Sequence, residues 1–315
     1  MTPTTEAPAV SVVIPAYNAD WCVAKAIDSV LAQRDGGAFE VLVVDDGSTD
    51  GTWEWLRNQD GVVAIRTDNW GKDWAVETAL RAARGEYVRF LDSDDWLCEG
   101  SNDVQLALAR ESGADLVVAG YEDHDDETGR RQAHQWVDCD DFIAQQLGEV
   151  WSSHYSAFLF RRELIRDIPH RQDFALRDDR LFVIEVALRQ PRVAVHRAPA
   201  FVHRHHGGDR LQRTAGFRRD LGYWTHIAIY RKTLAILESR GELTLRRKRA
   251  AIGVMWDNVR AFARAYPREA AEIYDWIRSL DPEFVPQVRT PVALAYKVLG
   301  FATTERLLGL RARLT

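Results

Sequence analysis

Residues 40–50 read EVLVVDDGSTD, an apolar run that ends abruptly in two aspartates, a glycine and further polar residues. A valine-rich run bounded by turn residues is typical of a buried strand. The polar residues that follow suit a turn, and Asp50 can cap a helix that ends near Leu56. The stretch therefore predicts a strand, a turn and a helix in direct succession, the unit of a parallel α/β sheet.

The same alternation extends on both sides of this stretch, through the first 120 residues. Strands separated by helices imply right-handed βαβ units and a mostly parallel sheet. In such sheets ligands bind at the carboxyl ends of the strands. Strands are expected at 10–15, 40–44, 62–66, 87–91 and 114–119, and helices at 20–34, 50–56, 73–83 and 101–111.

The pattern changes after residue 120. The polar stretch 122–131 is expected to form a loop or hairpin, and from about residue 215 only helical patterns follow, in four expected segments. We therefore expect an α/β domain to about residue 210 and a helical appendage after it. In the intervening part, short helices are expected at 140–147, 161–168 and 178–189, and strands near 157–160 and 192–196.

The composition narrows the class of protein and its compartment. The chain has 315 residues, 46% of them hydrophobic, which is enough for one large domain or two smaller ones. A net charge of −6 argues against a nucleic-acid partner, since nucleic-acid-binding domains are usually basic. The three cysteines have no metal-binding spacing and the N-terminus has no signal-peptide pattern, so we expect a cytoplasmic protein with reduced thiols.

The C-terminal segment 292–314 mixes leucine and alanine with four basic residues. Its longest apolar run, 292–302, is broken by Lys297 and is far short of the roughly 20 residues that span a membrane. A basic amphipathic segment of this kind could lie at the inner face of a membrane as a peripheral contact. Packing against the rest of the chain, or against a second copy in a homo-oligomer, is the favoured alternative.

Two acidic clusters follow strands of the expected sheet, DDGSTD at residues 45–50 and DSDD at residues 92–95. So many aspartates repel one another unless a cation or hydrogen-bond donors compensate. Mg²⁺ or Mn²⁺ typically takes one or two carboxylates and fills its other positions with phosphate oxygens and water. Each cluster alone is a common turn or helix cap, but together they predict a cation site that holds a diphosphate.

Three motifs resemble those of the family 2 glycosyltransferases: SVVIPAYN at 11–18, VVDDGSTDGT at 43–52 and GEYVRFLDSDDWL at 85–97. The resemblance is specific through about residue 97, weak to about residue 207 and absent from the C-terminal third. It implies a GT-A fold and an inverting sugar transfer. It also implies a GT-A catalytic domain over 1–210, with a nucleotide-binding half at about 8–120 and an acceptor half at about 121–210, and then a helical region over 211–315.

The resemblance implies roles for single residues on the donor side. Asp46 would hydrogen-bond the base, typically N3–H of uracil, and Tyr17 would pack against it, with core packing as the alternative for Tyr17. Asp94 would bind the Mn²⁺ or Mg²⁺ that carries the diphosphate, Asp92 would contact the ribose or the metal shell, and Asp95 could contact the sugar. The donor-binding residues implied in this way are Pro15, Ala16, Tyr17, Asn18, Asp46, Asn69, Lys72, Asp92, Ser93 and Asp95.

One departure from the family pattern concerns charge near the donor. Family members often read Asn-x-Gly-x-x-x-Ala-Arg-Asn after the third strand. Residues 69–77 keep the Asn, Gly and Ala, but Val76 and Glu77 replace the Arg-Asn pair. A cationic contact is therefore missing or supplied elsewhere. Lys72 is the candidate substitute, with a solvated lysine as the favoured alternative.

An inverting transfer needs a base that takes the proton of the acceptor hydroxyl. The segment 174–182 matches the place of a Glu-Asp pair in the family, which makes Asp179 the candidate base and Asp178 the replacement for the usual Glu. The alternative is that both acids only stabilise the dipole of a helix N-terminus. Upstream, Trp151 and His154 could line the acceptor pocket, with plain packing as an equal alternative.

Residues 203–210 read HRHHGGDR, a dense polar run after an expected strand near Phe201. A zinc site from the three histidines His203, His205 and His206 is conceivable, but zinc sites normally draw a fourth ligand and better-separated positions. In the family a basic residue or histidine here lies on a loop that closes over the diphosphate. We expect that role for one of Arg204, His205 and Arg210.

The expected activity follows from these residues and the resemblance together. The donor is expected to be a UDP-linked sugar, the cofactor Mn²⁺ or Mg²⁺, and the transferred group hexosyl or N-acetylhexosaminyl. The acceptor is expected to be a hydroxyl of a cell-surface polysaccharide, a teichoic-acid-like polymer or a lipid-linked sugar. Two other classes stay open: a non-catalytic sugar-binding or scaffold protein that uses some of the 11 tryptophans, and a phosphoryl-transfer protein that uses the Asp45-Asp46 pair.

Overall fold

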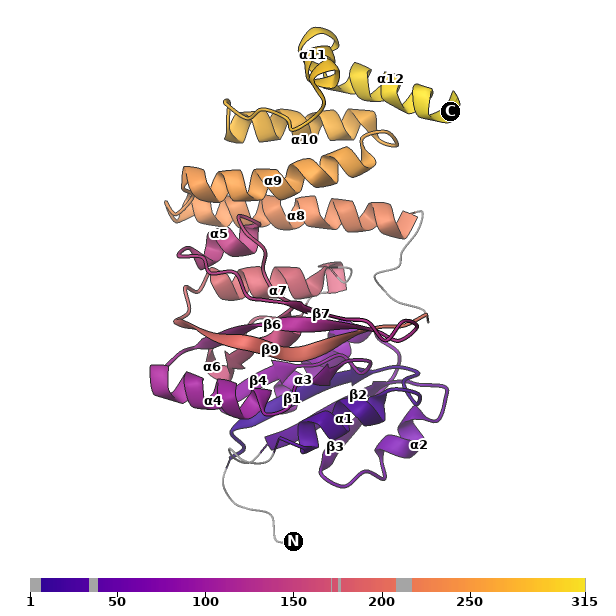
Figure 1. Cartoon of the computed structure of the whole chain (residues 1–315), viewed down its shortest axis with the longest axis vertical. Coiled ribbons are helices and arrows are strands. Elements are labelled where there is room, and N and C mark those ends of the chain that lie inside the picture. Colours follow the sequence, from indigo (N-terminus) through magenta and orange to yellow (C-terminus); the bar gives the residue numbers. More distant parts are fainter. Residues whose placement is uncertain (1–6, 34–38, 171, 175–176, 208–216, 315) are drawn as a thin grey trace. The chain divides into compact units, whose positions relative to one another are not determined.

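The computed structural model describes residues 7–33, 39–170, 172–174, 177–207 and 217–314 (Figure 1). Backbone packing divides the chain into two compact units. The sheet unit consists of Met1–Asp138 and Ser152–Asp209, and the helical unit of Cys139–Trp151 and Arg210–Thr315. The insert Cys139–Trp151 therefore packs with the C-terminal helices, whereas the sequence analysis placed it in the acceptor half.

Within the described residues, the sheet unit holds one nine-stranded sheet in the order β3-β2-β1-β4-β8-β6-β9-β5, with β7 paired to β6. The first four strands of this order are parallel. β1, β2 and β4 are buried along almost their whole length and form the centre of the core, which confirms the strands expected from their apolar runs. The bounds are β1 Val10–Ala16, β2 Phe39–Asp46, β3 Val62–Thr67 and β4 Tyr87–Phe90.

The other half of the sheet is mixed. β8 runs antiparallel to β4 and β6, β9 runs parallel to β6, and β5 pairs antiparallel with β9. β6 and β7 form a hairpin, one of the two conformations expected for the polar stretch after residue 120. The bounds are β5 Trp96–Leu97, β6 Leu116–Asp125, β7 Arg131–His134, β8 Leu159–Arg161 and β9 Val193–His205.

β9 is longer than the sequence analysis expected. The strand predicted at 192–196 continues to His205, so the polar residues from His203 to His205 lie on a strand and not on a loop. The continuation is possible because β9 stays paired with β6 across a bulge, where Pro199 lies opposite Gly120. Proline lacks a backbone N–H, so it is tolerated at an irregularity of this kind inside a sheet.

Helices connect the strands of the sheet unit and pack on the sheet. α3 contacts β1 and β2, and α4 contacts β6 and β9. The helix predicted over 20–34 begins only at Val23, and the one predicted over 161–168 is a single turn. The bounds are α1 Val23–Leu31, α2 Thr52–Leu56, α3 Lys72–Ala82, α4 Ser101–Ser112, α6 Arg162–Ile165 and α7 Asp178–Ala187, with 3-10 turns η1 Tyr155–Ala157 and η2 Gln172–Phe174.

The described part of the helical unit contains five helices after residue 215, one more than expected, together with α5 from the insert. α9 packs against α5, α8 and α10, and α12 packs against α10 and α11 (Figure 1). The additional helix arises because Gly300, with φ of 76°, separates α11 from α12. The bounds are α5 Phe142–Leu147, α8 Phe217–Ser239, α9 Leu245–Phe262, α10 Pro267–Leu280, α11 Thr290–Leu299 and α12 Phe301–Leu314.

Ion pairs fix the insert to the start of α9. Arg246 contacts Asp140 at 2.5 Å and Glu149 at 2.7 Å, and Arg247 contacts Asp141 at 2.8 Å. The basic run at the beginning of α9 is thus matched by acidic residues of the insert. This pairing explains why the insert belongs to the helical unit although the sheet unit flanks it in sequence.

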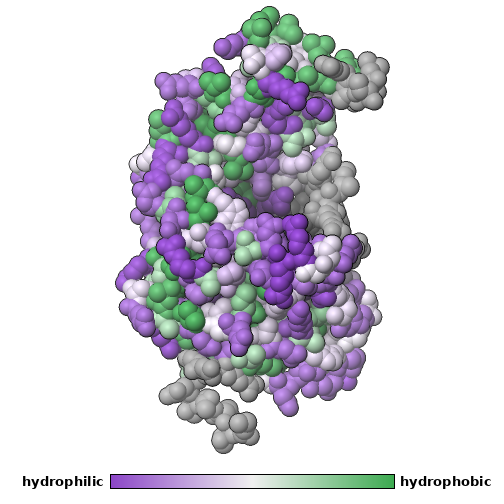
Figure 2. Space-filling view, in the orientation of Figure 1, coloured by the Kyte–Doolittle hydropathy of each residue, from purple (hydrophilic) through white to green (hydrophobic). Residues whose placement is uncertain are grey.

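The end of the helical unit presents apolar side chains. Figure 2 shows hydrophobic residues gathered at the end that holds α11. Leu294 and Val298 of α11, and Leu307 and Leu310 of α12, are exposed. Among the described residues, no helix has both the length and the hydrophobicity that crossing a bilayer requires.

Candidate active site

The carboxyl ends of β1, β2 and β4 lie at one edge of the sheet, because the three strands are parallel neighbours. Ala16, the last residue of β1, lies opposite Asp45 of β2. The residues that follow these strands, such as Tyr17 and Asp92, therefore come to the same edge. The structure brings both acidic clusters of the sequence to this edge of the sheet unit.

Three aspartates after β4 crowd into a small space. One carboxylate oxygen of each of Asp92, Asp94 and Asp95 lies within 4.8 Å of the others. Asp95 is buried, and its Oδ1 accepts a hydrogen bond of 2.8 Å from the backbone N–H of Arg204. Its Oδ2 is buried without a hydrogen-bond partner among the residues that the structure describes. Burial, and then repulsion from Asp92 and Asp94, raises the pKa of Asp95 well above its ordinary value.

This crowding fits a hard divalent cation. A buried carboxylate oxygen without a donor, next to two further carboxylates, is the kind of site that Mg²⁺ or Mn²⁺ stabilises. Asp94 and Asp92 keep partly exposed side chains, at 28% and 23%, so an ion bound to them can also reach phosphate oxygens and water. Asp95 is buried beside them, and its expected contact with a sugar stays a prediction.

Lys72 is paired with Asp92 and is not a solvated lysine. Its Nζ lies 2.6 Å and 2.8 Å from the two carboxylate oxygens of Asp92. Burial works against the charge of both groups, but their mutual attraction dominates. It holds the pKa of Lys72 well above its ordinary value and the pKa of Asp92 below its ordinary value. The positively charged side chain of Lys72 thus lies beside the Asp-x-Asp motif, although the Arg-Asn pair of the family is missing.

His206 is a site residue that the sequence analysis did not place on the donor side. Its Nε2 lies 3.1 Å from Oδ2 of Asp94, and its ring centroid lies 4.7 Å from that of Trp21. Arg204 reaches the cluster only through its backbone, because its guanidinium pairs with Asp126 at 2.7 Å. His205 faces Asp123 instead. The alternation of side chains along β9 explains this division, and a sequence signal for it exists only if residues 203–205 are taken as a strand.

Arg210, the third residue considered for the diphosphate loop, lies outside the described residues. The two others, Arg204 and His205, lie on β9 and are held there by the carboxylates of Asp126 and Asp123. Both residues therefore lie on a strand and not on the loop that the sequence predicted, and their contact with a diphosphate stays a prediction.

Asp46 holds the loop that precedes α3. Its Oδ1 accepts a hydrogen bond of 2.9 Å from the backbone N–H of Trp70, and its Oδ2 accepts one of 2.8 Å from that of Gly71. Gly47 is required next to it, because a Cβ there would lie 2.8 Å from the backbone nitrogen of Asn69. Oδ1 also accepts the hydroxyl of Thr67 at 3.3 Å, so Oδ2 is the oxygen that can take a further donor, and recognition of a base by Asp46 stays a prediction.

The residues after β1 line the same edge. Pro15 and Ala16 are buried strand residues, whereas Tyr17 is 48% exposed and presents its ring to solvent. Asn18, with φ of 48°, donates its backbone N–H to Ser48 and accepts the backbone N–H of Thr49, so it ties the first strand end to the second. Tyr17 is therefore available for stacking and is not a core residue. Ser93, from the Asp-x-Asp motif, hydrogen-bonds the thiol of Cys22.

Asp45 does not form the pocket that a phosphoryl-transfer protein would need. The residue is fully buried, and its Oδ2 lies 3.5 Å from Nε of Arg66. Its Oδ1 accepts the backbone N–H of Ser48 at 3.3 Å. A carboxylate enclosed in this way supports the turn after β2 and offers no surface to a phosphate donor.

The candidate base lies at the first turn of α7. Asp179 is exposed, whereas Asp178 is buried and accepts a hydrogen bond of 2.5 Å from Nδ1 of His170. The His170 ring also stacks on Phe182, with the centroids 4.5 Å apart, so two residues of α7 hold the imidazole that pairs with Asp178. The charge of Asp179 contributes to the raised pKa of Lys72. Its role as a base stays a prediction.

Asp73 is an acidic residue that sequence reasoning missed. It lies in the first turn of α3 and is buried. Burial, and then repulsion from Asp178, raises the pKa of its carboxyl to about 7, with Asp179 adding to the effect and Lys72 opposing it. From sequence alone the residue looks like an ordinary partner of a helix dipole. It adds a proton-binding group beside the candidate base.

The two residues considered for the acceptor side lie in different units. His154 belongs to the sheet unit, where its ring stacks on His203 at 5.2 Å and lies 5.7 Å from Phe201. The positive charge that His154 can carry helps to keep the pKa of Asp92 low. Trp151 belongs to the helical unit and is 38% exposed. Contact of either residue with an acceptor stays a prediction.

Comparison with known proteins agrees with this geometry. The family model for glycosyl transferase family 2 matches residues 11–169. EpsH of Bacillus subtilis (strain 168) is 26% identical over 77% of this chain and 73% of its own length. TarS of S. aureus, solved in complex with UDP-GlcNAc, is 19% identical and has a TM-score of 0.61 over 97% of this chain and 91% of the solved one. The mannosyltransferase PcManGT of Pyrobaculum calidifontis, solved with GDP-Man and Mn²⁺, is 20% identical, with a TM-score of 0.50 over 97% and 88%.

The two solved structures show that this chain shares their GT-A fold, a curled sheet of mostly parallel strands followed by C-terminal helices. The acidic motifs of the sequence lie within the matched residues, at the strand ends where this fold binds its ligand. Because the family model covers half of the sequence, the chain belongs to glycosyl transferase family 2.

Proposed function

We propose that this chain is a metal-dependent, inverting glycosyltransferase that moves a hexosyl or N-acetylhexosaminyl group from a UDP-linked donor to a hydroxyl. The observation that carries the proposal is the crowded group of Asp92, Asp94 and Asp95, with a buried Asp95 oxygen that has no hydrogen-bond partner among the described residues. An exposed aspartate in the first turn of α7, Asp179, adds a second acidic group. Such a pair of acidic groups suits two tasks: holding a cation that carries a diphosphate, and accepting a proton from the attacking hydroxyl.

Asp94 and Asp92 would hold Mn²⁺ or Mg²⁺, which supplies charge neutralisation for the leaving diphosphate. Lys72 keeps Asp92 ionised and oriented through two contacts below 3 Å. His206 holds the other carboxylate of the motif through its contact with Asp94 at 3.1 Å. These side chains of the protein orient the two carboxylates before any donor arrives, which lowers the cost of ordering them on binding.

Asp179 would act as the base. The acceptor oxygen attacks the anomeric carbon, the bond from that carbon to the diphosphate oxygen breaks, and the hydroxyl proton passes to the Asp179 carboxylate. Attack from the side opposite the leaving group inverts the anomeric centre. Asp178, held by His170, fixes the first turn of α7 and so orients Asp179. The exposure of Asp179 supports this role, because an acceptor must reach the base.

The acceptor is proposed as a class: a hydroxyl of a cell-surface polysaccharide, a teichoic-acid-like polymer or a lipid-linked sugar. The exposed apolar residues of α11 and α12 support a surface contact of the helical unit, for which a membrane and a second copy of the chain are the proposed partners. Co-sedimentation with anionic vesicles and the mass of the protein in solution distinguish the two partners.

The test measures donor binding and turnover separately in the variant Asp179→Asn. We expect the variant to bind UDP with Mn²⁺ as the wild type does, and to lose about 10³-fold or more in the rate at which UDP is released from UDP-GlcNAc or UDP-Glc. Asp60→Asn changes an exposed aspartate that precedes β3, whereas the candidate site follows the carboxyl ends of the strands, so it is the matched control and should keep both properties. Wild-type rates in Asp179→Asn would remove this residue from the role of base.

A further inference from the structure

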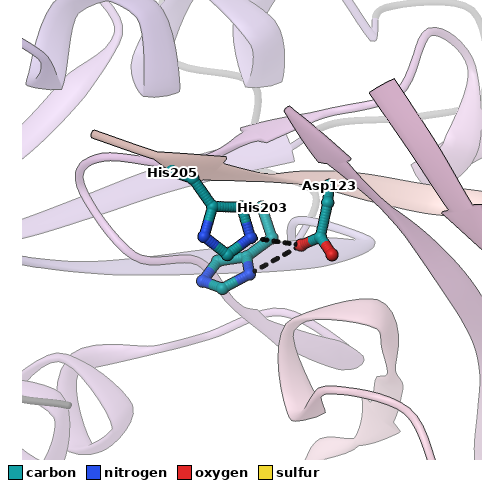
Figure 3. A group of neighbouring side chains, drawn as sticks. All are labelled: Asp123, His203 and His205. Atoms are coloured by element: carbon teal, nitrogen blue, oxygen red, sulfur yellow. Dashed lines mark hydrogen bonds and ion pairs between the residues drawn. The ribbon is translucent and has the colours of Figure 1, made fainter. Parts of the chain in front are cut away.

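A second group of possible metal ligands lies on β6 and β9. Asp123 on β6 is in register with His203 on β9, and because side chains alternate along a strand, His205 lies on the same face. Oδ1 of Asp123 lies 3.1 Å from Nδ1 of His203 and 2.7 Å from Nε2 of His205. Figure 3 shows both imidazole rings directed at this one oxygen. Three possible ligands, two imidazoles and one carboxylate, thus meet from two neighbouring strands.

We propose that Asp123, His203 and His205 bind a second divalent cation of the Zn²⁺ class, separate from the cation of the Asp-x-Asp motif. Two imidazoles and one carboxylate are ligands that suit Zn²⁺, whereas Mg²⁺ prefers oxygen ligands alone. With metal–ligand distances of about 2.0–2.1 Å, ligand atoms of a tetrahedral site lie roughly 3.3 Å apart. The observed separations of 3.1 Å and 2.7 Å therefore need to open by about 0.2 Å and 0.6 Å.

His134 on β7 supports the other oxygen of the carboxylate. It is in register with Tyr121, two residues before Asp123 and on the same face of β6, and its ring stacks on Tyr121 at 4.8 Å. Its Nε2 lies 2.7 Å from Oδ2 of Asp123. An imidazole that hydrogen-bonds a ligating carboxylate fixes the direction of the ligand oxygen, an arrangement frequent around protein metal sites. His134 therefore orients Asp123, and the remaining position of the cation falls to water.

The group is partly open to solvent, so a cation can enter. The exposed fractions of the side chains are 13% for His203, 25% for Asp123 and 37% for His205. The ring centroids of His203 and His205 lie 4.6 Å apart. The ring of His154 also stacks on that of His203, with the centroids 5.2 Å apart. Ring packing on His203 and the hydrogen bonds to Asp123 fix most of the site before a cation arrives.

The sequence alone could not define this site. The three histidines after Phe201 suggested zinc, but the structure separates them: His206 faces Asp94, whereas His203 and His205 face Asp123. The missing ligand came from a strand about 80 residues earlier in the chain. On the proposed function, a cation here would also hold the end of β9 that presents the Arg204 backbone and His206 to the Asp-x-Asp cluster.

The test measures Zn²⁺ binding to the full chain without a histidine tag, by competition with a chromophoric chelator, and uses the Co²⁺ absorption spectrum as a second probe. We expect one tight site in the wild type and in Asp94→Asn. Affinity should fall at least about 100-fold in His203→Ala and His205→Ala, and about 10-fold in His134→Gln. His196→Gln, on the same strand but outside the group, is the matched control and should bind as the wild type does.

Thermal unfolding keeps the proposal testable if a variant folds poorly. Zn²⁺ should raise the Tm of the wild type by about 5 °C and leave that of the milder His205→Gln unchanged, while the metal-free proteins unfold at similar temperatures. Wild-type binding weaker than about 100 µM, or binding that survives His203→Ala and His205→Ala, would overturn the proposal. So would loss of the Zn²⁺ site in Asp94→Asn, whereas loss of UDP binding in that variant bears only on the proposed function.

Discussion

At the scale of single residues, the site is a group of three carboxylates whose hydrogen-bonding and charged partners differ from one aspartate to the next. Asp92 has Lys72 and Asp94 has His206, but within the described part of the chain the buried side chain of Asp95 has only the backbone N–H of Arg204. The motif DSDD predicted that these carboxylates share a site. It could not predict their partners, because Lys72 reaches Asp92 from the first turn of α3 and His206 follows a strand more than 100 residues away.

Asp73 gives a prediction about pH at the same scale. The folded state raises the pKa of its carboxyl from an ordinary 3.8 to about 7, so the folded state binds this proton more tightly than the unfolded state. Stability is therefore lost as the pH rises from about 4 to about 7, and the penalty is constant above that. We expect Asp73→Asn to raise the free energy of unfolding by on the order of 2 kcal/mol at pH 8 and to leave it unchanged at pH 4.

Urea unfolding of Asp73→Asn at the two pH values checks this prediction. Asp60→Asn is the control, since that side chain is exposed in a turn and its removal should matter little at either pH. An equal effect of Asp73→Asn at pH 4 and pH 8 would show that the carboxyl does not carry the burial penalty assigned to it.

At the scale of elements, apolar runs predicted the parallel strands well, whereas mixed runs did not. VSVVIP and EVLVV are buried on almost every position and form β1 and β2 as expected. The polar end of β9 was mistaken for a loop, because its strand conformation depends on pairing with β6 and on the bulge at Gly120, neither of which a local pattern contains. With that register known, the alternation of His203, Arg204 and His205 follows at once.

Alanine substitutions at two glycines test the packing of these elements, and we expect them to change the free energy of unfolding in opposite directions. A Cβ at Gly120 would lie 2.1 Å from the carbonyl oxygen of His134, so Gly120→Ala should push β6 and β7 apart and cost about 2–3 kcal/mol. Gly253, inside α9, has open space around it, so Gly253→Ala should stabilise the protein by roughly 0.5–1 kcal/mol. Chemical unfolding measures both, and a neutral Gly120→Ala would contradict the close approach at the hairpin.

At the scale of the whole molecule, the order of strands and helices predicted the fold class, and the family motifs predicted the catalytic half. The membership of residues 139–151 in the helical unit was not predictable, because it rests on ion pairs such as Arg247 with Asp141, which join segments about 100 residues apart. The division of the last helices at Gly300 was missed because the apolar pattern continues across it. The first case depends on long-range pairing and the second on the local conformation of Gly300, and neither follows from the apolar pattern.

The central claim is that carboxylates at the end of β4 hold a cation that carries the donor diphosphate. Isothermal titration calorimetry of UDP, with Mn²⁺ and then with EDTA, tests it most directly in the wild type, Asp94→Asn and the control Asp60→Asn. The account predicts that UDP binds the wild type and the control only when Mn²⁺ is present, and at least about 10-fold more weakly to Asp94→Asn. UDP binding that is equally strong with EDTA, or unchanged in Asp94→Asn, would contradict it.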